Sequence, residues 1–194
     1  MAKLEDHLRS FGMSALLISD EISQIEAAYS VNLQDRGKSS AEDPRGYYGQ
    51  FDNLIRLQAS EMAAHYELFY CLEQSMRKLI TGTLFDKSGA DWWNKDVPER
   101  IRSDVSERMH RDVDSGFSLR SENEIDFTNF GELSVIISAN WDNFGAIFSS
   151  RRAVERIMNS LNLLRGPIAH CSPLAEDEVE RLNLTVKDWF RSMG

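Results

Sequence analysis

The sequence predicts an all-α protein, and three observations lead to that fold class. The 194 residues include only 4 prolines and 11 glycines, so few positions interrupt a helix. Apolar residues recur every three or four positions along most of the chain, as they do in amphipathic helices. No stretch shows the alternation of apolar and polar residues that predicts a strand. We therefore expect a bundle of four to five core helices with a helical extension at the N-terminus.

The chain is expected to divide into an N-terminal extension, residues 1–50, and a main helical domain, residues 51–194. Four apolar residues of the extension recur at helical spacing: Ile18, Ile22, Ile25 and Tyr29. The segment 34–49, QDRGKSSAEDPRGYYG, is rich in turn-forming residues and can bury little apolar surface. It is therefore expected to be a loop or hinge at the boundary.

The first long helix of the main domain is predicted over residues 52–80, and Gly82 indicates a stop shortly afterwards. Its inner stripe is expected to be Met62, Tyr66, Phe69, Met76 and Ile80. Residues 86–98 then form a connector that carries Trp92 and Trp93. These two rings are expected to anchor the core rather than to stack on bases, because no basic residues alternate with them.

Three further helices are predicted before the C-terminal one. The first begins after Pro98, and its apolar side is Ile101, Val105 and Met109. The second covers residues 130–148 and ends or bends at 143–145. Its apolar stripe is Phe130, Leu133, Ile137, Trp141, Phe144 and Phe148. The third follows an N-cap at Ser149 or Ser150, and its stripe is Val154, Ile157, Met158, Leu161 and Leu164.

The final predicted helix starts with Ser172 as its N-cap and Pro173 at the first helical position. Acidic residues 176–178 fall near its positive end, where a helix favours negative charge. Its inner face is expected to be Val179, Leu182, Val186, Trp189, Phe190 and Met193.

Composition and charge exclude several classes of protein. The net charge of −9 argues against non-specific coating of nucleic acid, although it leaves room for a local basic site. No apolar run reaches the roughly 20 residues of a membrane helix, and the mixed charges of the first residues lead us to expect no export signal. We expect a cytoplasmic protein with no membrane partner, in which Cys71 and Cys171 are reduced thiols. His7, His65 and His110 show no ligand spacing, so neither a metal nor a cofactor is expected.

Arg165 is the most unusual residue of its helix. It follows Leu161 by four residues and Met158 by seven, which places its side chain inside the apolar stripe. A guanidinium cannot lose its charge, and an unpaired buried charge is strongly unfavourable. Arg165 must therefore meet a carboxylate, face a cleft or bind an anion.

His170 stands five residues after Arg165. On a regular helix that spacing rotates the two side chains about 140° apart. Gly166 and Pro167 lie between them and favour a kink or break, which would bring the imidazole back towards the guanidinium or aim both groups into a cleft between two subunits. The alternatives are purely structural: Arg165 would belong to an ion pair, and the imidazole of His170 would bind the backbone at a helix boundary.

Glu73 is the third candidate, because it lies between Phe69 and Met76 in an apolar stripe. Arg77 is one turn further along and could pair with it. Glu73 is thus a candidate partner for Arg165 or His170 if their helices pack together. A purely structural carboxylate satisfied by Arg77 is the alternative.

The order of an apolar helix, Arg-x4-His and a capped C-terminal helix resembles the HEPN superfamily. The run LLRGPIAHCSPLAEDEVERL is similar to the Swt-type branch of that superfamily. Two upstream stretches, YELFYCLEQSMRKLI and DFTNFGELSVIISANWDNF, fit the same resemblance. It covers residues 66–193.

The resemblance implies an all-α fold that dimerises with the motif at a composite cleft. It also implies a metal-independent endoribonuclease of the kind found in phage defence and toxin–antitoxin systems, where a companion protein neutralises the enzyme. Arg165 and His170 match the catalytic pair, and Glu73 is the added candidate. One position departs from the pattern, because Gly166 replaces a residue that is commonly polar and often Asn. The expected partners are RNA and a second copy of the chain.

Three functions remain open at this stage: a catalytic endoribonuclease, a non-catalytic HEPN module that binds RNA or protein through a site degenerate at Gly166, and a nucleotide-binding sensor. Arg151, Arg152 and Arg156 form a small basic cluster that could guide RNA phosphates or simply face solvent. Thiol catalysis by Cys171 is disfavoured, because a neighbour of His170 in sequence need not face it in space.

Overall fold

The computed structural model describes residues 21, 22, 24, 25, 46–116, 118 and 120–194. Contacts divide the chain into two units, Met1–Asn53 and Leu54–Gly194.

In the first unit, Ile22 and Ile25 lie in helical backbone, and a 3-10 turn, η2, covers Tyr48–Gln50. Ile18 and Tyr29 of the predicted N-terminal helix lie outside the described residues, as does most of the predicted loop.

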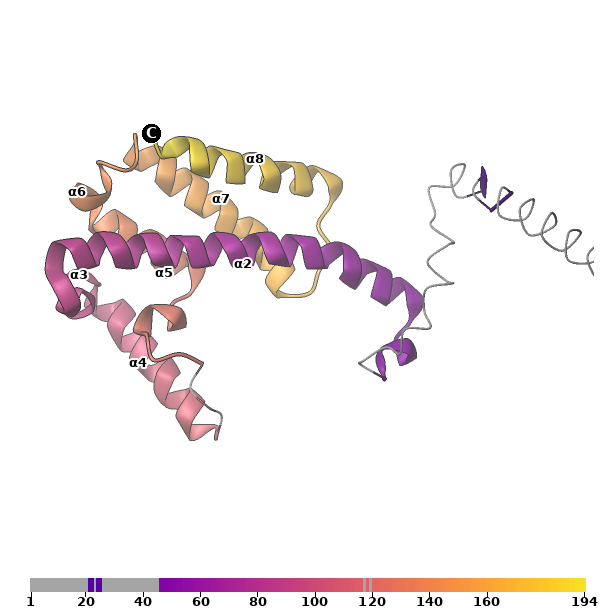
Figure 1. Ribbon diagram of the computed structural model, residues 1–194, viewed down its shortest axis with the longest axis horizontal. Helices are drawn as coiled ribbons and strands as arrows, with labels where there is room; N and C mark the ends of the chain where they lie inside the picture. Colours follow the sequence, from indigo (N-terminus) through magenta and orange to yellow (C-terminus); the bar gives the residue numbers. More distant parts are fainter. Residues whose placement is uncertain (1–20, 23, 26–45, 117, 119) are drawn as a thin grey trace, which may run out of the picture. The chain divides into compact units, whose positions relative to one another are not determined.

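The all-α fold class is confirmed in the part of the chain that the structure describes, where no strand occurs (Figure 1). From α2 onward the elements are α2 (Asn53–Ser88), η3 (Gly89–Asp91), α3 (Trp92–Asp96), α4 (Glu99–Asp114), η4 (Glu124–Phe127), α5 (Phe130–Ala139), α6 (Trp141–Phe144), α7 (Arg151–Ala169) and α8 (Glu176–Ser192). Helix α7 packs against both α5 and α8.

One apolar core joins these helices. Helix α2 contributes a buried stripe that consists of Phe69, Leu72, Met76, Ile80 and Leu84. The ring of Phe69 meets the ring of Phe130 on α5 edge to face, with centroids 6.1 Å apart. Trp92 and Trp93 are both buried, which confirms their prediction as core anchors. Each large apolar side chain buried in this way stabilises the fold by about 1.5–3 kcal/mol.

The prediction of a stop near Gly82 is wrong, because α2 continues through it to Ser88. A glycine inside a helix costs only about 1 kcal/mol. Ile80 and Leu84 on either side are fully buried, and their packing outweighs that cost. The prediction of Tyr66 as a core residue is also wrong, since its side chain is exposed.

The amphipathic stretch 130–148 forms two helices rather than one. Helix α5 ends before Asn140, and α6 ends at Phe144, within the predicted end region. The side-chain amide of Asn140 donates to the carbonyl oxygens of Ile136 (3.0 Å) and Asp96 (2.8 Å). These bonds fix the corner between the helices, and the apolar spacing carried no sign of them.

Of the N-caps predicted for the two C-terminal helices, one is confirmed and one is wrong. Ser150 is the N-cap of α7, as predicted, and its hydroxyl accepts from the backbone N–H of Ala153 at 3.4 Å. The predicted start of the last helix at Ser172 is wrong. Its N-cap is Ala175, whose backbone N–H donates to the Glu178 carboxylate at 3.1 Å. Phe190 was predicted on the inner face but is exposed.

Candidate functional site

A cavity of about 570 Å³ lies between α2, the end of α4 with the segment that follows it, and the last turn of α7. Helix α2 supplies a stripe of lining residues at helical spacing: Tyr66, Tyr70, Glu73 and Arg77. The stripe lies beside the buried face of α2. The packing that holds α2 in the core therefore also fixes the direction of these four side chains.

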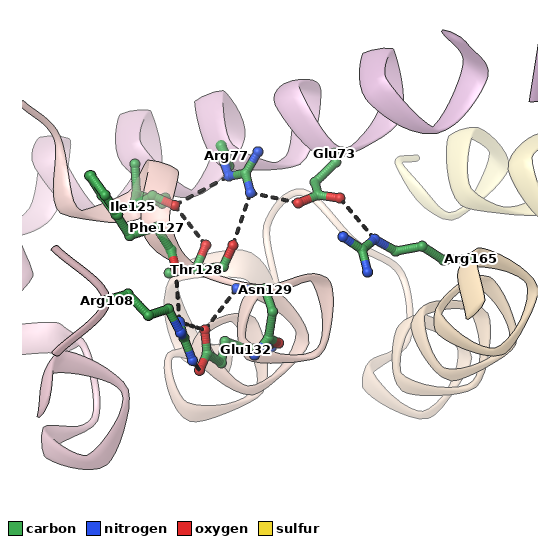
Figure 2. A network of polar contacts seen from close by, with 9 residues as sticks. All are labelled: Glu73, Arg77, Arg108, Ile125, Phe127, Thr128, Asn129, Glu132 and Arg165. Atoms are coloured by element: carbon green, nitrogen blue, oxygen red, sulfur yellow. Dashed lines mark hydrogen bonds and ion pairs between the residues drawn. The ribbon is translucent and has the colours of Figure 1, made fainter. Parts of the chain in front are cut away.

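Within this cavity, the carboxylate of Glu73 is shared by two arginines (Figure 2). Nη2 of Arg77 donates to Oε1 at 2.5 Å, and Nε of Arg165 donates to Oε2 at 3.3 Å. Arg77 also donates to the backbone oxygens of Ile125 at 3.2 Å and Thr128 at 3.0 Å. Of the three partners that the sequence left open for Glu73, namely Arg77, Arg165 and His170, the first two pair with its carboxylate.

This trio carries a net charge of +1, because one carboxylate faces two guanidinium groups. Glu73 and Arg77 are largely buried, whereas 37% of the Arg165 side chain is exposed. Among the described residues Arg165 pairs through Nε alone, so Nη1 and Nη2 remain available to a ligand in the cavity. An anion with two oxygens in one plane matches that free edge.

A second arginine network forms the opposite wall, and the sequence reasoning missed it. Arg108 on α4 holds both oxygens of Glu132 at 2.5 and 2.8 Å and also donates to the carbonyl of Phe127 at 2.7 Å (Figure 2). Glu132 closes a capping box with Asn129 at the start of α5. The hydrogen bonds that Arg108 donates to the Glu132 carboxylate raise the pKa of Arg108 above its ordinary value. The Asn-x-x-Glu spacing was the available signal for the cap.

Arg120 also lines the cavity and is held from two sides. Its guanidinium bonds both carboxylate oxygens of Asp112, at 2.8 and 2.9 Å, and lies 4.9 Å from the ring centre of Phe127. The hydrogen bond from Arg120 lowers the pKa of Asp112. Arg120 is therefore fixed by its own partners.

Helix α7 does not break between Arg165 and His170. It continues through Gly166 and Pro167 to Ala169. His170 is the C-cap residue and is exposed, and it does not line the cavity that holds Arg165. Within the described residues, Glu73 and Arg165 are thus in contact, whereas His170 lies exposed at the C-terminal end of α7.

The chain reverses directly after His170. The N–H of Ser172 donates to the carbonyl of Pro167 at 2.8 Å, and the N–H of Cys171 donates to that of Ile168 at 3.4 Å. This is the Schellman ending of a helix, in which glycine usually takes the left-handed position. Cys171 takes that position here with φ of 55°. Because Ser172 closes α7, it does not serve as the N-cap of α8.

Gly166 is the position at which the chain departs from the pattern of the family that its sequence resembles. A Cβ built at Gly166 would meet no atom within 4 Å, leaving out its chain neighbours and the nearby helix backbone. The backbone there is helical, so a side chain such as Asn fits without strain. The glycine therefore reflects no steric demand of the fold.

The predicted basic cluster lies apart from the cavity. Arg151, Arg152 and Arg156 are exposed on the first turns of α7, and none of them lines the cavity. Arg151 stands about 21 Å along the helix from Arg165. It donates to Glu155 at 2.9 Å, and this bond lowers the pKa of Glu155.

Within the described residues, no group of three or more His, Cys, Asp and Glu side chains has metal-binding geometry. No helix in that part of the chain is both long and apolar enough to cross a membrane.

A family model described as Swt1-like HEPN matches residues 67–194, which is more than half of the chain. The matched region contains Glu73, Arg165 and His170. No curated protein and no solved structure shows significant similarity to the chain.

Proposed function

The chain belongs to the Swt1-like HEPN family, and from this membership and its charged cavity we propose that it is a metal-independent endoribonuclease. The observation that carries the proposal is the net positive trio of Glu73, Arg77 and Arg165. Because Arg165 lines the cavity and two of its nitrogens bond no other described residue, its guanidinium suits a phosphodiester of RNA.

In the proposed reaction, the imidazole of His170 takes the proton of a ribose 2′-hydroxyl. The 2′ oxygen attacks the adjacent phosphorus, and the bond from phosphorus to the 5′ oxygen breaks. The 5′ oxygen takes up a proton from the solvent and His170 later releases its own proton to the solvent, which leaves a 2′,3′-cyclic phosphate and a 5′-hydroxyl. Arg165 holds the phosphate and stabilises the charge that develops on its oxygens in the transition state.

We propose that the active unit is a homodimer in which Arg165 of one subunit acts with His170 of the other. This arrangement is supported by the exposure of His170 and by its absence from the cavity wall of its own chain. Two inactive variants, Arg165→Ala and His170→Ala, are to be mixed and allowed to exchange subunits. A shared site regains activity in the mixed dimer, whereas a site built within one chain does not.

The test of the activity itself is cleavage of single-stranded RNA in the presence of EDTA. We expect cleavage that leaves a cyclic phosphate and is lost in His170→Ala. The same sequence made as DNA has no 2′-hydroxyl and should remain intact. Cleavage that requires a divalent metal, or that persists without His170, contradicts the mechanism.

A second candidate, a non-catalytic HEPN module that binds RNA or a partner protein, is favoured by Gly166. Because the space beside Gly166 is open, Gly166→Asn can be made without disturbing α7. If Gly166→Asn cleaves RNA and the natural chain only binds it, the natural protein is the binding form. Gly166→Ala serves as the control for helix propensity.

Phage defence or a toxin–antitoxin pair is the proposed biological setting, with a companion protein that neutralises the nuclease. In that setting, production of the chain alone in growing cells arrests growth, and production of Arg165→Ala does not. Equal growth of the two strains at matched protein levels would remove this setting from the proposal.

A further inference from the structure

Two exposed tyrosines line the same cavity as Arg165 and are not part of the buried core. Tyr66 and Tyr70 are one turn apart on α2, with 62% and 57% of each residue exposed. Their ring centres are 6.3 Å apart, and the planes meet at 34°. The rings thus form a continuous aromatic surface along one side of the helix.

This tyrosine pair belongs to the same α2 wall as Glu73 and Arg77. Tyr66, Tyr70, Glu73 and Arg77 follow one another at intervals of four, three and four residues, and all four line the cavity. The aromatic surface therefore lies one to two helical turns from the carboxylate that holds Arg165. A nucleotide whose phosphate meets Arg165 has aromatic faces within reach of its base.

The cavity continues along α2 into a second groove of about 710 Å³, and Gln74, Arg77 and Asp126 line both. Lys78 is exposed at the edge of this groove. Together the two hollows are lined by five basic and three acidic side chains, on a chain whose net charge is −9. Arg108 and Arg120 are paired with Glu132 and Asp112, so the cations of this path that can still meet a ligand are Arg165 and Lys78.

We propose that Tyr66 and Tyr70 stack the base of an unpaired nucleotide next to the phosphate bound by Arg165, so that the site selects single-stranded RNA. Aromatic side chains beside a basic groove bind single strands, because every unpaired base offers a flat face and a base inside a duplex does not. This inference rests on the proposed function and specifies its substrate class.

The test measures binding apart from cleavage. The probe is a mixed-sequence 2′-O-methyl RNA of about 12 nucleotides, which spans a typical single-strand site. It lacks the attacking hydroxyl and cannot be cut by the proposed route. Affinity is measured by fluorescence anisotropy for the single strand and for the same strand annealed to its complement.

We expect the natural chain to prefer the single strand. Each change of Tyr66 or Tyr70 to alanine should weaken single-strand binding about ten-fold. Tyr66→Phe and Tyr70→Phe should stay within about three-fold of the natural chain, because they keep the ring. Phe190→Ala is the matched control, since Phe190 is equally exposed on α8 but lines neither hollow.

The salt dependence of RNA affinity distinguishes base stacking from contacts with phosphate charges. The alanine variants of the tyrosines should leave the slope of log affinity against log salt unchanged, whereas Arg165→Ala should reduce it by about one. Equal affinity of the alanine variants and the natural chain overturns the inference, even if the protein cleaves RNA. Tyrosine-dependent binding without cleavage of natural RNA supports the inference and refutes the nuclease.

A second copy of the chain is the competing occupant of the tyrosine surface, and light scattering on each variant tests for it. One outcome is that the alanine variants become monomers whose loss of RNA affinity is fully explained by the loss of the dimer. In that case the tyrosines belong to a subunit contact and the inference is wrong.

Discussion

The two arginine networks on facing walls of the cavity consist of the same residue types, arginine and glutamate, but they differ in net charge. Arg108 and Glu132 pair one to one, with both carboxylate oxygens occupied and a helix cap completed. Glu73 instead faces Arg77 and Arg165, so one positive charge is left over. The balanced pair ties α4 to the start of α5, and the unbalanced trio keeps a cation directed at the cavity.

The difference shows how one residue type serves structure and chemistry within one cavity. A side chain such as Arg108, whose Nη1 and Nη2 both bond protein oxygens, stabilises the fold and has less left for a ligand than Arg165 has. Arg165 has given one nitrogen to Glu73, which orients it, and retains two for binding. Substitutions of a ligand-binding arginine are therefore expected to affect activity, and substitutions in a fully paired network are expected to affect stability.

The largest effect is expected from Arg165→Ala. Removing a group that stabilises transition-state charge should lower RNA cleavage by about 100-fold to 1,000-fold. Arg165→Lys should not restore it, because an ammonium lacks the planar fork. Cyclic-phosphate product is to be quantified in single-turnover reactions. Thermal unfolding serves as the control, and a large fall in Tm would assign Arg165 to the structure instead.

The next effect is on stability, and it belongs to the balanced pair. Glu132→Ala removes a largely buried carboxylate that has two bonds to Arg108 and one to the Asn129 N–H. We expect a loss of about 3 kcal/mol in the free energy of unfolding, measured in urea. Glu107→Ala, which removes the exposed pair with Arg111 on α4, is the control and should change it by less than about 0.5 kcal/mol. A similar loss in both variants would contradict the ranking.

A smaller effect is expected from Glu73→Gln, which raises the charge of the trio from +1 to +2. The free energy of unfolding should fall by about 1–2 kcal/mol in a buffer without multivalent anions. Inorganic phosphate should then raise the Tm of this variant more than that of the natural chain, because it replaces the missing negative charge. Equal shifts in both proteins would show that the trio binds no anion.

The smallest effect concerns Arg120, the third arginine on the cavity wall. Its hydrogen bond lowers the pKa of Asp112, so this pair stabilises the fold above the ordinary pKa of an aspartate and loses that contribution as the pH falls. Asp112→Asn should therefore destabilise slightly at pH 6, and the difference should be smaller at about pH 3, which lies below the ordinary pKa of an aspartate. Urea unfolding at the two pH values checks this. A constant difference would exclude the ion pair as its cause.

The trio of Glu73, Arg77 and Arg165 was predictable from sequence because local helical geometry determines one of its two ion pairs. The spacing of Glu73 and Arg77 is one turn, and the place of Arg165 in an apolar stripe requires a partner. Arg108 was missed because its partner lies 24 residues away, across a turn that apolar periodicity does not describe.

Other errors of sequence reasoning have the same origin. Periodicity placed Tyr66 in the core stripe of α2, but it does not reveal how far along the helix the neighbouring helices reach. Ser172 and Pro173 have the composition of a helix start, yet the N–H of Ser172 closes the preceding helix. Tertiary contacts decided both positions.

Pro167 has a consequence for the timing of motion at the end of α7. It has no amide hydrogen to donate to the carbonyl of Leu163, so the ladder of backbone bonds has a gap between Arg165 and His170. Segments held by fewer backbone bonds open more often in native-state hydrogen exchange. Amide protons on the His170 side of that gap should therefore exchange faster than those on the Arg165 side, so the two halves of the motif differ in local stability.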